Sequence, residues 1–208
     1  METPEDQAIL ESFLRHTEII VGGITEDAVA RIEQPEDICW VWARYLRMPL
    51  VAYKITRDSN YLNLFVRGMA TLFTRLREGP GGYLGFRGLP LPLFRDPQNP
   101  NAEIEVDISE FEIARLICDF TVLVRGEEGL RNKYQKDAQR LMEVVERHLA
   151  GPKWEERGLY VDLGPLGAIF RMPPECGNGR DNLTNPHNKL SKICRAYLAL
   201  YRASGKDD

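Results

Sequence analysis

The chain has few of the residues from which metal and redox sites are built. It contains three histidines and four cysteines in 208 residues. No two cysteines form a Cys-x-x-Cys pair, which is the usual spacing of a structural zinc site, so we predict no metal and no cofactor. Three cysteines lie inside apolar helical runs and are expected in the core, whereas Cys176 lies in a polar loop. The four are Cys39, Cys118, Cys176 and Cys194.

The chain also lacks a long apolar run and an excess of basic residues. No run approaches the roughly 18 apolar residues of a membrane span. The start, Met-Glu-Thr-Pro-Glu-Asp, lacks the profile of a signal peptide, so we expect a cytoplasmic protein or a secreted one whose leader has been removed. The net charge of −4 argues against a nucleic-acid partner. It fits a neutral ligand, or an anionic ligand that local arginines bind.

What the chain does have is helical periodicity, punctuated by glycine and proline. A hydrophobic content of 43% is ordinary for one globular domain, here spanning 1–208. Two long loops, 78–107 and 151–187, separate groups of helices. Helices are predicted over residues 5–16, 25–32, 36–56, 60–77, 108–124, 130–149 and 189–201.

The order helix, short turn, helix, long loop occurs twice, and a third unit starts at Lys189. The junction 50–58 resembles the junction 198–207. Repeats of this size indicate stacked helical hairpins. We therefore expect a lead-in over 1–35 and repeats over 36–208, with the last hairpin incomplete.

The predicted helices alternate in kind. Three of them, 38–53, 111–124 and 190–201, are apolar on nearly all sides and are expected to be inner helices. The helices 60–77 and 130–149 are amphipathic and are expected to be outer ones. Polar residues interrupt these inner helices. In the helix 111–124, the polar residues fit a ladder of ion pairs between inner helices. The interruptions are Arg44, Arg47, Glu112, Arg115, Asp119, Lys192 and Arg195.

This pattern resembles the α/α toroids of the six-hairpin glycosidase-like and toroid polysaccharide lyase families. The matching segments are the turn Asp58-Ser-Asn-Tyr-Leu62, the loop Gly-Gly-Tyr-Leu-Gly-Phe and the helix entry Asn-Pro-His-Asn. The resemblance covers residues 36–208 and implies an all-α fold of antiparallel hairpins that form a partial toroid. A full toroid has several more hairpins than the two and a half found here, so the chain is either a fragment or self-associates through its incomplete end.

The resemblance implies a carbohydrate-active protein, first a polysaccharide lyase that cleaves uronic-acid glycans by β-elimination. In that role Asn185 would polarise the carboxylate, His187 would be the base and Tyr83 a base or acid, while Arg87 or Arg180 would bind the uronate. Further expected substrate-binding residues in the second loop and at the start of the last helix are Glu175, Asn182 and Asn188, with Trp154 stacking on a sugar.

Simpler roles remain open for the same residues. His187 fits a helix-start residue that bonds locally, the asparagines fit turns and caps, and Tyr83 fits an aromatic plug. A glycoside hydrolase is the second alternative, and a non-catalytic repeat module for binding or assembly is the third. The carboxylates available to a hydrolase are Asp107, Glu110, Glu112, Glu175 and Asp181.

Overall fold

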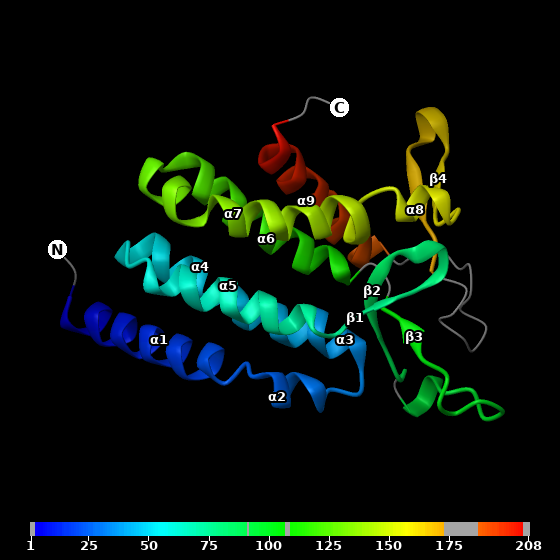
Figure 1. Cartoon of the computed structure of the whole chain (residues 1–208), viewed down its shortest axis with the longest axis horizontal. Coiled ribbons are helices and arrows are strands. Elements are labelled where there is room, and N and C mark those ends of the chain that lie inside the picture. Colours follow the sequence, from blue (N-terminus) through cyan, green and yellow to red (C-terminus); the bar gives the residue numbers. More distant parts are fainter. Residues whose placement is uncertain (1–2, 91, 107–108, 173–186, 206–208) are drawn as a thin grey trace.

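The computed structural model describes residues 3–90, 92–106, 109–172 and 187–205 (Figure 1). It is mostly helical, which confirms the prediction of an all-α fold. Two π-helical turns, η1 (Ile38–Trp42) and η4 (Val145–Leu149), continue into or out of longer helices. The α-helices are α1 (Pro4–Gly22), α2 (Glu26–Ala30), α3 (Pro35–Asp37), α4 (Ala43–Thr56), α5 (Asn60–Phe73), α6 (Glu110–Gly126), α7 (Glu128–Val144), α8 (Lys153–Glu156) and α9 (His187–Ser204).

Helices α4 and α5 form one hairpin, and α6 and α7 form another (Figure 1). The first turn is sharp because Arg57 adopts a left-handed conformation, with φ 62°, at the end of α4. The Asp58 carboxylate then accepts the Asn60 N–H at 2.9 Å, at the start of α5. Tyr134 on α7 donates to the Ser59 carbonyl oxygen at 2.8 Å. That bond ties α7 to the turn between α4 and α5.

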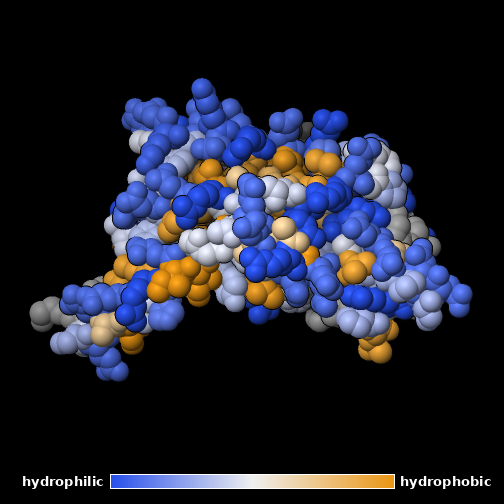
Figure 2. Space-filling model, turned by 60° about the horizontal axis from the view of Figure 1, so that its bottom comes forward, coloured by the Kyte–Doolittle hydropathy of each residue, from blue (hydrophilic) through white to orange (hydrophobic). Residues whose placement is uncertain are grey.

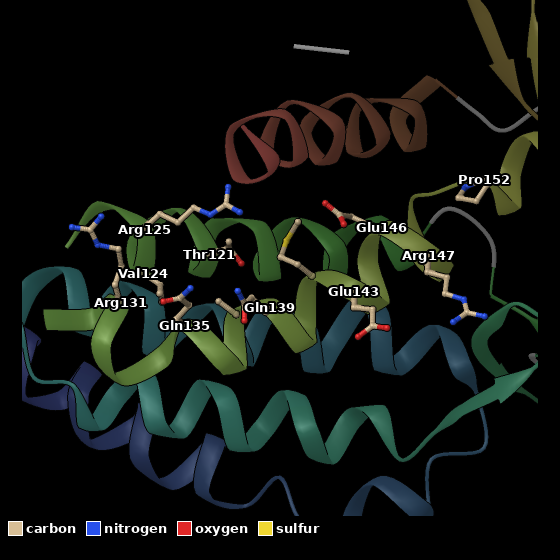
Figure 3. Close-up of a pocket in the computed structure, with 12 residues that line it drawn as sticks. Thr121, Val124, Arg125, Arg131, Gln135, Gln139, Glu143, Glu146, Arg147 and Pro152 are labelled. Atoms are coloured by element: carbon tan, nitrogen blue, oxygen red, sulfur yellow. The ribbon is translucent and has the colours of Figure 1, made fainter. Parts of the chain in front are cut away.

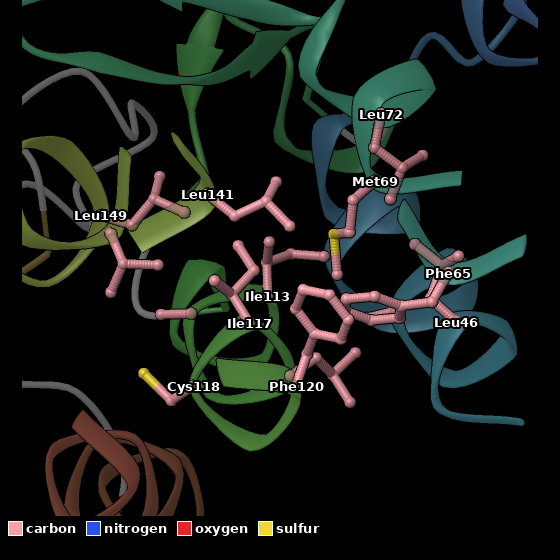
Figure 4. Close-up of a cluster of buried hydrophobic side chains, with 14 of the residues drawn as sticks. Leu46, Phe65, Met69, Leu72, Ile113, Ile117, Cys118, Phe120, Leu141 and Leu149 are labelled. Atoms are coloured by element: carbon pink, nitrogen blue, oxygen red, sulfur yellow. The ribbon is translucent and has the colours of Figure 1, made fainter. Parts of the chain in front are cut away.

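Helix α6 is the centre of the packing. It lies against α4 on one side, α9 on the other and its own partner α7, while α1 lies along α4 and α5. In α6 the side chains of Phe111, Ile117 and Phe120 are completely buried. The Phe120 ring lies 5.0 Å from that of Phe65 on α5, so the two hairpins share one core (Figure 4). The periodicity had predicted this core because apolar residues cover nearly every side of α6.

Helices α1, α5 and α7 run in one direction, and α4, α6 and α9 run in the other (Figure 1). Two helix ends and the burial of the last helix differ from the predictions. Helix α1 continues to Gly22, well past residue 16, and α5 ends at Phe73 rather than near residue 77. The last helix was expected to be buried nearly all round, but Leu198 and Tyr201 are each about half exposed.

The two long loops are not structureless, which corrects the prediction. The first holds the antiparallel sheet β1 (Leu76–Glu78), β2 (Leu84–Gly88) and β3 (Ile104–Glu105). The second holds the short helix α8 and the pair β4 (Tyr160–Asp162) and β5 (Ala168–Phe170), joined by the 3-10 turn η5 (Gly164–Leu166). The strands have two to five residues, too few for a clear alternating pattern.

The surface in Figure 2 is mostly hydrophilic, with separate hydrophobic patches. In the part of the chain that the structure describes, no helix has the length and apolar character needed to cross a membrane. Cys39 and Cys118 are buried as expected, but Cys194 is exposed, so its assignment to the core was wrong. Cys176 lies outside the described residues.

Candidate functional site

A cleft of about 210 Å³ lies where α4, α6 and α9 meet, and four of the eight residues that line it are arginines. Helix α4 contributes Arg44 and Arg47, which are one turn apart on the helix. Helix α6 contributes Glu112 and Arg115, and α9 contributes Arg195. Three helices that are far apart in sequence therefore bring four guanidinium groups to one concave place.

Arg115 is held rigidly within its own helix. Its guanidinium lies 3.1 Å from a Glu112 oxygen and 3.0 Å from an Asp119 oxygen. The expected ion pairs therefore exist, but they run along α6 and do not join it to another helix. Two acids next to one arginine leave Arg115 as a fixed donor with little net positive charge.

The other three arginines keep their charge available. Within the described part of the chain, Arg44, Arg47 and Arg195 have no carboxylate within salt-bridge distance. All three side chains belong to exposed residues. Because a charged side chain left unpaired in a concave place raises the local potential, the cleft favours an anion.

Trp40 of η1 lines the cleft and contacts two cations. The Arg44 guanidinium lies 5.6 Å from the centre of its ring, and Lys192 Nζ lies 2.9 Å from it. These are cation–π contacts, which hold the side chains in place and leave their charges intact. The Trp40 ring therefore contacts both cations and fixes where they lie.

A second polar group of residues lies at the end of the bundle where the strands are, but it is closed to solvent. Lys153 of α8 is completely buried, with Nζ 2.7 Å from a Glu105 oxygen and 2.6 Å from a Glu110 oxygen. Arg157 and Arg87 also contact Glu105, at 2.9 Å and 3.4 Å. This cluster joins β2, β3, α6 and α8. Because Glu110 has no exposed surface, it is a structural group and cannot meet a substrate.

Burial and pairing shift the pKa values of this cluster in different directions. Desolvation raises the pKa of Glu110 to about 8, despite the nearby Lys153. Desolvation also raises the pKa of Glu105, but Lys153 and Arg157 outweigh it and lower that pKa below its ordinary value. For Lys153, desolvation is outweighed by the two carboxylates, which raise its pKa. One carboxyl group of the pair therefore carries most of the negative charge.

Gly85 explains part of the glycine-rich loop. A Cβ atom at this position would lie 2.9 Å from an oxygen of Glu105 and 2.9 Å from an oxygen of Glu110. The Glu110 carboxylate also accepts the Phe86 N–H at 3.1 Å. The strand approaches the carboxylates closely enough for that bond to form, so a Cβ at position 85 would force the strand or the carboxylates to shift.

Two of the predicted residues, Tyr83 and Arg87, lie near this cluster. Tyr83 donates a hydrogen bond to Glu156, which raises the pKa of the Tyr83 hydroxyl. Arg87 is paired with Glu105 inside the protein and is only 14% exposed. His148 of η4 lies beside the first loop, because its ring accepts the Leu84 N–H at 3.2 Å and contacts the ring of Tyr83. Desolvation, then Arg147 and Lys153, lower the pKa of His148.

Trp154 is 1% exposed and stacks on Phe111 at 5.2 Å between ring centres. Its expected role in stacking on a sugar is therefore wrong. His187 and Asn188 are the first two residues of α9. The remaining predicted residues lie outside the described part: Glu175, Arg180, Asn182 and Asn185, as do Asp107 and Asp181 of the hydrolase alternative.

No family model matches the chain, and neither the curated proteins nor the solved structures contain a match to it. In the described ranges, no three His, Cys, Asp or Glu residues are grouped so that they could hold a metal ion. Unpaired guanidinium groups with one nearby acid bind and orient an anion, because they donate several hydrogen bonds in fixed directions.

Proposed function

We propose that the protein binds an anionic saccharide, a glycan that carries uronic acids, in the cationic cleft of the inner helices. The observation that carries the proposal is the convergence of Arg44, Arg47 and Arg195 on one cleft without carboxylate partners among the described residues. A guanidinium matches a carboxylate with two parallel hydrogen bonds. Two arginines one turn apart on α4 can each bind a carboxylate of an extended chain.

The choice of a saccharide rests on the resemblance to the toroid families and on the order of the helices. In this proposal α4, α6 and α9 are inner helices of a partial α/α toroid, and α1, α5 and α7 are outer ones. The cleft then lies on the inner surface, where an extended ligand can pass along several helices. The repeated carboxylates of such a ligand suit a row of cations better than a single small anion does.

Binding is tested with uronate oligosaccharides and a neutral oligosaccharide of equal length, by calorimetry at low salt. We expect binding of the uronate alone, weakened about tenfold or more by Arg47→Gln or Arg195→Gln. Arg140→Gln is the matched control, because Arg140 is an exposed residue of α7 outside the cleft. Equal binding of the neutral oligosaccharide, or unchanged binding by both cleft variants, would contradict the proposal.

Cleavage by β-elimination is a second candidate, and the position of His187 favours it. His187 begins α9, eight residues before Arg195, or about 12 Å along the helix axis. A base at this distance could act on a sugar next to the one that Arg195 holds. The test is the ultraviolet absorbance of the unsaturated product, with wild type and His187→Ala. Binding without any absorbance change would leave a binding protein and reject the lyase.

A further inference from the structure

Glu112 is the only carboxylate among the described residues that line the cleft between α4, α6 and α9. Its side chain is 20% exposed, so a ligand in the cleft can reach it. A negative charge at this place repels the same anion that the arginines attract. A cleft that served only to attract an anion would gain nothing from this acid.

Arg115 uses only one of the two oxygens of Glu112. The Arg115 Nε lies 3.3 Å from Oε2 of Glu112, and Nη2 lies 3.1 Å from the same oxygen. In the part of the chain that the structure describes, no donor is hydrogen-bonded to Oε1 of Glu112. Since an ionised carboxylate accepts hydrogen bonds at both oxygens, Oε1 is an acceptor that a ligand can use.

Arg115 supplies donors beside this acceptor. Its Nη1 donates to Asp119 at 3.0 Å, and a guanidinium has more N–H groups than its contacts with Glu112 and Asp119 use. A hydroxyl group both donates and accepts a hydrogen bond, so it matches an acceptor and a donor that lie side by side. A carboxylate or a sulfate matches only the donor, because it has no hydrogen to give to Glu112.

The opposite sides of the cleft suit the anionic group of a ligand. Arg44 and Arg47 on α4 and Arg195 on α9 have no carboxylate partner among the described residues. A ligand that carries a carboxylate and a hydroxyl is therefore oriented, with the carboxylate toward α4 and α9 and the hydroxyl toward α6. The volume of about 210 Å³ is below the roughly 300–1,000 Å³ of pockets for drug-sized ligands, which suits a single sugar ring.

We infer that Glu112 is the specificity-determining residue of the cleft, because its Oε1 accepts a hydrogen bond from a hydroxyl of the ligand. The cleft then takes hydroxy acids, such as one uronate ring of a glycan, and rejects anions without a hydroxyl. An anion of the second kind leaves Glu112 without a donor and close to a like charge. This inference rests on the proposed binding of an anionic saccharide in the same cleft.

The test compares glucuronate with cyclohexanecarboxylate at low salt. Both carry one carboxylate on a six-membered ring, and only glucuronate carries hydroxyls. The dissociation constant of each is measured by NMR titration of the full chain. The signal to follow is the indole N–H of Trp40, because Trp40 lines the cleft.

A second groove has to be measured apart from the cleft, because it suits an apolar acid. This groove of about 490 Å³ lies along α6 and α7 (Figure 3). Its lining includes the apolar side chains of Val124 and Met142 and the cation of Arg131. The methyl signal of Met142 reports binding there, so a probe that enters the groove is not counted as bound in the cleft.

We expect wild type to bind glucuronate about tenfold or more tightly than cyclohexanecarboxylate. Glu112→Leu removes the acceptor and should bring the two dissociation constants to within about threefold of each other. Glu112→Gln keeps an acceptor and should retain part of the preference. Arg47→Gln should weaken the binding of both probes by a similar factor. Asp119→Leu is the matched control, because Asp119 also contacts Arg115 but does not line the cleft, and it should leave the preference unchanged.

Equal affinities of the two probes in wild type overturn the inference and leave anion binding in place. An unchanged preference in Glu112→Leu also overturns it. An equal loss of preference in Asp119→Leu overturns it as well, since Glu112 would then act only by holding Arg115. If neither probe shifts the Trp40 signal, the proposed binding in the cleft fails together with the inference. Circular dichroism checks that each variant keeps its helices.

Discussion

Nζ of Lys153 lies 2.6 Å from Oε2 of Glu110, and both side chains are completely buried. The pair joins a short helix of the second loop to the start of the central helix. The Glu110 carboxylate accepts hydrogen bonds from the Phe86 N–H and from Lys153 Nζ. These bonds take the place of the hydrogen bonds that the two groups would make to water. The loops are therefore fastened to the bundle by ions as well as by apolar packing.

Replacing Lys153 by methionine should destabilise the protein strongly. The change leaves Glu105 and Glu110 buried without their shared cation, and breaking a buried pair costs about 3–5 kcal/mol. The measurement is the free energy of unfolding in urea. Lys136→Met on the exposed surface of α7 is the control and should change it by less than about 0.5 kcal/mol. Equal effects of the two changes would show that the cluster is not fastening the loops.

Glu110 should make stability fall as the pH rises. Its pKa in the folded protein is about 8, above the ordinary value of 4.5, so the folded state keeps a proton that the unfolded state loses between these values. The free energy of unfolding, measured at several pH values from 5 to 8, should decline less steeply in Glu110→Gln than in wild type. The difference between the two slopes isolates Glu110 from other titrating groups such as His148. Parallel curves would contradict the shift.

Gly85→Ala should destabilise the protein by about 1–3 kcal/mol, because the added Cβ would press on two buried carboxylates. Gly129→Ala offers the opposite case. Gly129 lies in the first turn of α7 with nothing within 4 Å of an added Cβ, so alanine should stabilise by about 0.4–1 kcal/mol. Thermal unfolding of both variants measures whether each change lowers or raises the stability of the protein. A gain for both would mean that strand β2 moves away at little cost.

Glu112→Gln should strengthen anion binding in the cleft by a few-fold. The change removes a negative charge from the lining and lets Arg115 share its donors with a ligand. Calorimetry with the uronate oligosaccharide at two salt concentrations measures it. The gain should shrink at higher salt, because exposed charges are screened. A weaker affinity would indicate that Glu112 is needed to hold Arg115 in position.

Thiol labelling should distinguish the cysteines. Cys194 is exposed, whereas Cys39 and Cys118 are buried, and burial raises the pKa of Cys118 to about 12. A thiol reagent should therefore modify Cys194 in the native protein, and Cys39 and Cys118 only after unfolding. Peptide mass spectrometry after a timed reaction reads all three sites. Rapid native labelling of Cys118 would mean that α6 opens locally.

The helices could be predicted from the sequence because periodicity records which side of a helix is buried. Residues 111–124 are apolar nearly all round, and α6 is the central helix. The short strands were missed because two to five residues carry no usable period. Trp154 was misplaced because an aromatic residue in a polar loop can equally be an anchor, and here it stacks on Phe111.

The sequence indicated the residues of the candidate site but not that they lie together. Arg44, Arg47 and Arg195 stood out as polar interruptions of apolar helices, which is the signal that finds the cleft. Their convergence depends on how α4, α6 and α9 pack, and no spacing along the chain encodes that. The buried cluster was equally hidden, since Glu105 and Lys153 are 48 residues apart.

The ion cluster also bears on the order of events during folding. The two hairpins link neighbours in sequence, so they close with small loss of chain entropy and form early. The cluster links groups 43 and 48 residues apart and must shed its water when it closes. We expect it to form after the main barrier, so that loosening it mainly speeds unfolding and leaves the folding rate nearly unchanged.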